Sequence, residues 1–182
     1  MARENAGVRR SGGERMEEEV RSIRLPEWEM IPDIGLYMDQ VITLMERTFS
    51  PALPKGEITK SMVNNYVKVE LIPRPVGKKY DREHLALLMM IGVLKQALSM
   101  ESVAKMLALL CAQGVQSGYT RFAREADQLE RALEQGRLDL SLGSDSPQEK
   151  ALHAGVTAAV CTISANRLLA GAHKGGEKAQ QG

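Results

Sequence analysis

Residues 59–69 read TKSMVNNYVKV, and this stretch decides the expected fold. Threonine is a favoured helix N-cap, so Thr59 predicts a short helix that runs to about Val69. At about 100° per residue, polar and apolar side chains fall on opposite sides of this helix. The apolar side holds Met62, Val63, Tyr66, Val67 and Val69, and the polar side holds Lys60, Ser61, Asn64, Asn65 and Lys68. A helix that reads DNA needs this division, because one side is buried and the other enters the major groove.

The segments on either side complete a helix-turn-helix pattern. Asp33 is the expected cap of a first helix whose apolar residues continue to Phe49, and proline and glycine break the chain over residues 50–56. Residues 71–80 read LIPRPVGKKY; two prolines and a glycine exclude a helix there and predict a short β-ribbon, or wing. From Thr59 to Arg82 six basic residues stand against two acidic ones, an excess of four, although the whole chain carries only +1. Such a local excess favours contact with phosphates.

The residue types on the polar side match the chemistry of base recognition. Asparagine can bind adenine in a bidentate way, serine can bind several base edges, and lysine can reach guanine or phosphate. Lysines on the ribbon would contact the DNA backbone, which adds affinity without sequence preference. The predicted DNA-contacting residues are Thr59, Lys60, Ser61, Asn64, Asn65, Lys68, Arg74, Lys78 and Lys79.

Further helices follow. Asp81 caps a third helix, and Ser99 ends it and caps a fourth. Gly114 and Gly118 are expected to break the chain before an amphipathic helix from about Tyr119 to Glu134. Ser146 with Pro147 and Glu149 predicts the start of a last helix, rich in alanine, that ends near Leu169.

These elements predict an all-α chain: a winged helix-turn-helix part with a short β-ribbon wing, followed by a C-terminal helical bundle. We expect a flexible arm over residues 1–24 and a helix-turn-helix domain over 25–112. A C-terminal helical region, which could form a dimer, is expected over 113–170, and a disordered tail over 171–182.

Composition narrows the function classes. The longest apolar run, Leu85 to Leu98, is interrupted by Lys95 and is too short for the roughly 18–20 residues of a membrane span. The charged N-terminus lacks the apolar stretch of a secretory signal. Cys111 and Cys161 stand among apolar and small residues, as expected of reduced thiols in a cytoplasmic protein. His84, His153 and His173 are scattered, so no metal site, catalytic residue or cofactor is predicted, and we expect no enzyme.

Residues Thr59 to Leu107 resemble the winged helix-turn-helix of MerR-type regulators. The resemblance lies in the aromatic Tyr66 of the reading helix, the ribbon end Gly77-Lys78-Lys79-Tyr80 and the helical hairpin that closes with residues 97–103. Three positions depart from that pattern, because Asn64, Glu70 and Lys79 stand where MerR proteins have arginine, glycine and arginine. No long dimerisation coiled coil and no cysteine cluster follow. The resemblance therefore implies DNA binding but no particular inducer.

Residues 31–41 and 58–66 look more closely like a bacterial family of unknown function called YkrK-like, whose members are described as transcriptional regulators. This closer likeness covers roughly Leu25 to Leu142. It implies a regulator that binds double-stranded DNA, and helix-turn-helix proteins usually bind as dimers, so a homodimer is expected. The competing interpretation is an adaptor for proteins or small ligands that retains the helix-turn-helix scaffold. Whether a small-molecule effector exists stays open.

Overall fold

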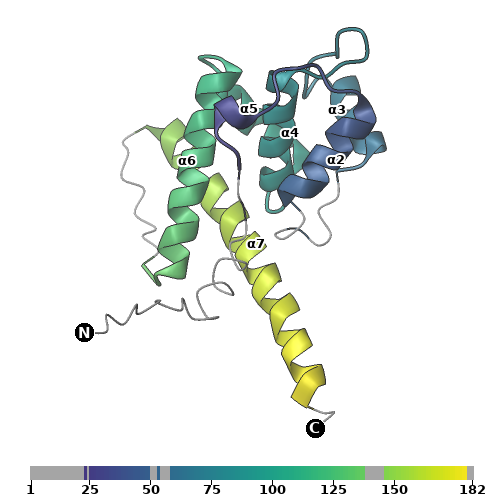
Figure 1. The fold of residues 1–182 in the computed structure, drawn as a ribbon. Coiled ribbons are helices and arrows are strands. Elements are labelled where there is room, and N and C mark those ends of the chain that lie inside the picture. Colours follow the sequence, from purple (N-terminus) through teal and green to yellow (C-terminus); the bar gives the residue numbers. More distant parts are fainter. Residues whose placement is uncertain (1–22, 24, 50–52, 54–57, 138–145, 180–182) are drawn as a thin grey trace, which may run out of the picture.

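The computed structural model describes residues 23, 25–49, 53, 58–137 and 146–179, with side chains as far as Leu169 (Figure 1). The predicted flexible arm lies outside this description, apart from Ile23. The described part is helical: a 3-10 turn η1 (Trp28–Met30), then α2 (Met38–Phe49), α3 (Lys60–Lys68), α4 (Arg82–Leu94), α5 (Met100–Leu110), α6 (Val115–Glu134) and α7 (Pro147–Ala179). The all-α prediction is confirmed.

Helix α4 is the centre of the fold. Every residue from His84 to Leu94 is buried, and the helix contacts α2, α5, α6 and α7. Its sequence is apolar on all sides, which suits a helix that neighbours surround completely. Met89 and Met90 are fully buried, so they belong to the core. The predicted cap is confirmed, because Asp81 Oδ1 accepts from the His84 amide at 3.1 Å. His84 Nδ1 lies 3.2 Å from the Asp81 amide nitrogen and 2.6 Å from Asp81 Oδ1.

Helices α5 and α6 cross closely at Gly118. A Cβ atom there would lie 2.5 Å from the Leu110 carbonyl oxygen, so only glycine allows this approach. Because α6 begins at Val115, Gly118 lies inside this helix rather than before it, and the predicted start near Tyr119 is wrong. The break is Gly114, whose φ of +106° is unfavourable for any side chain. The predicted cap of α5 is confirmed, because Ser99 Oγ accepts from the Ser102 amide at 3.2 Å.

Helix α7 packs along the bundle with its first half and projects away from it with its second half (Figure 1). Its start is as predicted, since Ser146 Oγ accepts from the Glu149 amide at 3.4 Å. Up to Leu169, the last residue of α7 whose side chain is described, Ile163 is the last buried apolar residue. The helix continues past the predicted end near Leu169 to Ala179. Residues 180–182 of the predicted tail lie outside the described residues.

The segment before α2 is not α-helical, and η1 is the one helical turn among its residues. Its residues 25–37, which we call the strap, lead from α6 toward the chain that follows α3. Leu36 forms an antiparallel bridge with Tyr80, with both amide–carbonyl distances 2.8 Å. This pairing uses backbone groups that a helix would need, so α2 begins only at Met38, and Asp33 does not cap it. The Asp33 carboxylate instead lies 3.5 Å from the Arg82 guanidinium.

The predicted β-ribbon is reduced to a tight turn over residues 76–79, which we call the basic turn. Val76 and Lys79 form one isolated bridge, closed by an amide–carbonyl distance of 2.9 Å. Gly77 and Lys78 both have positive φ, +57° and +64°, as the two central residues of a type I′ turn do. Within the described residues, the segment forms no regular strand, because prolines at 73 and 75 cannot donate to a ladder.

No helix in the described ranges has both the length and the hydrophobicity that crossing a membrane would require.

Candidate nucleic-acid interface

Helix α3 is fixed at both ends by local hydrogen bonds. Thr59 Oγ1 accepts from the Met62 amide at 3.2 Å, which confirms the predicted cap. At the other end, the Leu71 amide donates to the Tyr66 carbonyl at 2.8 Å and the Glu70 amide donates to the Val67 carbonyl at 3.2 Å. This is a Schellman motif, and Glu70 occupies its left-handed position with φ +57°. A short helix held this way presents its surface in one orientation.

The two sides of α3 differ as the sequence predicts. Val63 and Tyr66 are buried, Met62 and Val67 are half-buried, and burial raises the pKa of the Tyr66 hydroxyl. The polar residues of the helix and its cap are all exposed: Thr59, Lys60, Ser61, Asn64, Asn65 and Lys68. Val69 is the exception on the apolar side, because it is 58% exposed. It is the C-cap, where the chain already leaves the helix, so helical periodicity no longer places it.

Lys60 is not a free cation. It forms an ion pair with Asp39, in the first turn of α2, and both side chains are largely exposed. Water and salt screen such a pair, so a phosphate can compete for the ammonium group. The pair was not predicted, because Asp39 and Lys60 meet only when α2 and α3 pack together.

The basic turn follows α3 in the chain and lies in the loop at the top of Figure 1. Its Lys78 and Lys79 are exposed, as is Arg74 before it. The Lys79 ammonium lies 5.4 Å from the ring centroid of Tyr37 in the strap, a cation–π contact. Gly35 makes room for the lysine stem, because a Cβ there would lie 2.9 Å from Lys79 Cβ. The structure thus joins Lys79 to the strap, whereas no hydrogen bond or ion pair in the described ranges joins the basic turn to α3.

A hollow on the outer side of α2 was missed by the sequence interpretation. Its volume is about 350 Å³, and it is lined by Asp39, Gln40, Thr43, Leu44 and Arg47. Arg47 is the one basic side chain among these lining residues. The polar residues of this hollow do recur at helical spacing in the sequence. Most surface helices have such a polar side, so the spacing alone could not predict a hollow.

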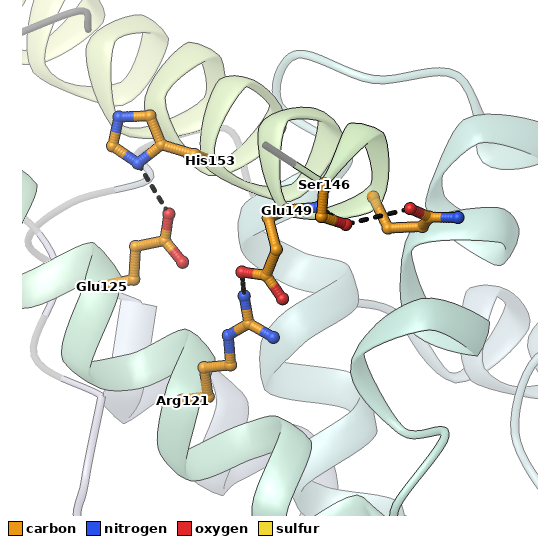
Figure 2. Close-up of polar contacts among 6 residues, drawn as sticks. Arg121, Glu125, Ser146, Glu149 and His153 are labelled. Atoms are coloured by element: carbon orange, nitrogen blue, oxygen red, sulfur yellow. Dashed lines mark hydrogen bonds and ion pairs between the residues drawn. The ribbon is translucent and has the colours of Figure 1, made fainter. Parts of the chain in front are cut away.

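A polar cluster lies elsewhere, between α6 and α7 (Figure 2). Arg121 pairs with Glu149, and Glu125 Oε1 lies 2.9 Å from His153 Nδ1. In Figure 2 both acceptors face side chains of the opposite helix, so the cluster joins two helices rather than lining an opening. In the described part of the chain, His153 Nε2 is buried without a hydrogen-bond partner. The geometry assigns the cluster a role in packing.

The described residues offer little else for catalysis or metal binding. No three histidine, cysteine or acidic side chains among them gather as a metal site would require. Cys111 and Cys161 are free and half-buried. Burial, with a smaller effect of Glu83, raises the pKa of the Cys111 thiol, which makes it less reactive. His84 serves the start of α4, as described above.

Comparison with known proteins gives one result. A family model described as a domain of unknown function (DUF1836) matches residues 26–124. The matched interval runs from the strap to the middle of α6, so it contains α3 and the basic turn but not α7. No curated protein and no solved structure matches the chain.

Proposed function

This chain belongs to the DUF1836 family, whose function is unknown, and from the geometry of α3 we propose that it is a DNA-binding transcriptional regulator. The observation that carries the proposal is the division of α3. Val63 and Tyr66 are buried and Met62 and Val67 are half-buried, while Lys60, Ser61, Asn64, Asn65 and Lys68 form an exposed polar side. A major groove about 12 Å wide admits a helix presented in this way.

In the proposed complex, α3 lies in the major groove and α2 crosses the backbone. Asn64 and Asn65 bind base edges, with adenine the preferred partner of an asparagine amide. Lys78, Lys79 and Arg74 neutralise phosphates from the side of the basic turn, which acts as a much shortened wing of the MerR type. A homodimer would place two α3 helices on successive half-sites about 34–36 Å apart.

The test begins with in-vitro selection of duplexes from a random pool, followed by binding titrations on the selected sequence. We expect Asn64→Ala and Asn65→Ala each to cost about 1–3 kcal/mol on that sequence and to relax its base preference. Gln128→Ala, an exposed position on α6, is the matched control and should change neither. Unaltered affinity in a variant that combines Asn64→Ala, Asn65→Ala and Lys78→Gly would reject the proposal.

The lysine contribution is tested separately by salt dependence. Lys78→Gly removes the charge and keeps the positive φ that the turn requires. If Lys78 contacts a phosphate, the slope of log affinity against log salt should flatten by about 0.9, equally for all duplexes. An unchanged slope would remove Lys78 from the interface without affecting the assignment of α3.

A protein-interaction adaptor is the second candidate, and one observation favours it. Tyr37 and Val76, which both adjoin Lys79, are 55% and 81% exposed. Exposed apolar side chains of this kind can mark a protein contact. A photo-crosslinking residue at position 76 separates the candidates in cells: adducts with DNA support the regulator, and adducts with one defined protein support the adaptor.

A further inference from the structure

Among the basic residues of the proposed interface, Lys60 already has an acidic partner. Its ammonium group pairs with the carboxylate of Asp39, a residue in the first turn of α2. The other four basic residues proposed to contact DNA are Lys68, Arg74, Lys78 and Lys79. In the part of the chain that the structure describes, none of these four takes part in an ion pair. The candidate cation at the start of α3 is therefore occupied in the free protein.

The Asp39 carboxylate lies on the open surface rather than behind the lysine. Its side chain is 79% exposed, compared with 60% for the side chain of Lys60. A carboxylate that positions a lysine for DNA would be covered by that lysine and kept away from the phosphates. Asp39 instead meets the exposed polar side of α3 at Lys60, where the phosphates of a bound duplex would repel it.

We infer that Asp39 restrains DNA binding, because its carboxylate occupies the ammonium group of Lys60 that a phosphate would otherwise contact. Lys60 must leave Asp39 before it can contact a phosphate, and the carboxylate then remains near the DNA without its partner. Both effects weaken the binding of every duplex, whatever its base sequence. The inference rests on the proposed function, since its readout is DNA affinity.

The size of the restraint follows from the exposure of both partners. Water and salt screen the pair, so removing the carboxylate should strengthen DNA binding by about two- to fivefold. It should also free one cation to displace a counterion from the DNA. The slope of log affinity against log salt should then become steeper by up to about 0.9.

Asp39→Asn tests the restraint, because it removes the charge and keeps the size of the side chain. The affinity of the full-length protein for a random-sequence duplex is titrated at several salt concentrations. We expect the higher affinity and the steeper slope in the variant. An unchanged affinity would overturn the inference, and so would a lower one, which would make Asp39 a residue that positions Lys60 for DNA.

Glu101→Gln is the matched control. Glu101 pairs with Lys105 on α5 at 2.6 Å, and both side chains are exposed to a similar degree as those of the Asp39–Lys60 pair. This variant changes the net charge by the same amount and frees a lysine outside the proposed interface. Its affinity and slope should equal those of the wild type. An equal gain in Asp39→Asn and Glu101→Gln would assign the effect to net charge alone and overturn the inference.

A variant without the ammonium group shows whether Asp39 acts through Lys60. Lys60→Met keeps a flexible apolar stem, and in this background only the repulsion between Asp39 and the DNA is left to relieve. Asp39→Asn should therefore raise the affinity less here than in the wild type. Equal gains in the two backgrounds would mean that the pair plays no part. Asp39, Lys60 and Glu101 are exposed, so all variants should fold, which far-ultraviolet circular dichroism spectra verify.

The titrations separate a failure of the inference from a failure of the proposed function. Wild-type binding with no gain in Asp39→Asn would overturn the inference alone. If neither protein bound any duplex at low salt, the proposed function would be wrong, and the restraint with it.

Discussion

Helices α3 and α4 follow each other in the chain and begin alike, but their surroundings differ completely. Each starts with a side chain that accepts from the amide three residues later, Thr59 in α3 and Asp81 in α4. In α4 every residue from His84 onward is buried, whereas in α3 only Val63 and Tyr66 are. The same kind of N-cap hydrogen bond thus begins a core helix and a surface helix.

The difference shows where function can reside. A side chain on α4 has its contacts fixed by the core, so changing it alters stability first. Within the part of the chain that the structure describes, the exposed side chains of α3 make one ion pair, Lys60 with Asp39. Replacing them should therefore change stability little, and they are available for a partner.

The largest expected effect tests this contrast directly. Leu88→Ala removes a fully buried side chain from α4 and should lower the free energy of unfolding by about 2–5 kcal/mol. Asn65→Ala in α3 should change it by no more than about 0.5 kcal/mol. Urea unfolding curves give both values. Similar losses in the two variants would mean that the polar side of α3 is structural, which argues against its use in DNA binding.

A close backbone approach on the bundle side gives the next largest effect. Gly118→Ala would place Cβ against the Leu110 carbonyl, so we expect a loss of about 1–3 kcal/mol despite the higher helix propensity of alanine. Gly155→Ala in α7 is the control: its Cβ would clash only with the flexible end of Met106, with Leu98 at an ordinary 3.4 Å, so it should cost less. Thermal unfolding compares them. An equal loss of stability in the two variants would show that the α5 backbone at Leu110 can shift as easily as the Met106 side chain.

The end of α3 offers a stabilising change. The backbone of Glu70 has a φ of +57°. This left-handed conformation is unfavourable by about 1 kcal/mol for a residue with a side chain, whereas glycine adopts it freely. Glu70→Gly should therefore raise the free energy of unfolding by up to about 1 kcal/mol, and Glu70→Ala should bring no such gain. Urea midpoints of the two variants decide the point. A loss with glycine would mean that the Glu70 side chain makes a stabilising interaction.

The smallest expected effect is a difference in how stability depends on pH between the charged cap of α4, Asp81, and the neutral cap of α3, Thr59. Burial alone would raise the pKa of Asp81, but the hydrogen bonds and charge of His84 outweigh it, so its pKa is lowered. A lowered pKa stabilises the fold above the unfolded value of about 3.9, and this contribution is lost as the pH falls through the folded value.

Asp81→Asn keeps a good cap without the charge, so stability should fall less steeply with pH below about 4 than in the wild type. Thr59→Asn changes the neutral cap of α3 and should leave the slope as it is. Unfolding measured in acidic buffers tests both variants. An unchanged slope for Asp81→Asn would show that the charge of Asp81 does not contribute to stability.

Much of this fold follows from local patterns. Thr59, Asp81, Ser99 and Ser146 act as predicted caps, because N-capping depends on residues only three positions apart. The exposed side of α3 was likewise predictable from periodicity. The start of α2 was not, because the bridge from Leu36 to Tyr80 joins residues far apart in sequence. The position of Gly118 was not either, because a glycine that breaks a helix and one that admits a neighbour look the same in sequence.

The candidate site divides in the same way. The residue types on α3 and the positive charges near it are properties of the sequence. Their partners are not, because the Asp39–Lys60 pair and the Tyr37–Lys79 contact each join separate segments, as does a groove that the strap and α6 line beside Trp28.

By itself, the sequence determined which segments are helices, where most of them begin and which side of α3 is polar, since these depend on side chains within one or two turns. Only the tertiary structure decided that the strap runs from α6 to the basic turn and that a groove opens beside the single tryptophan. Those features arise from backbone pairing and packing between distant segments, which no local pattern encodes.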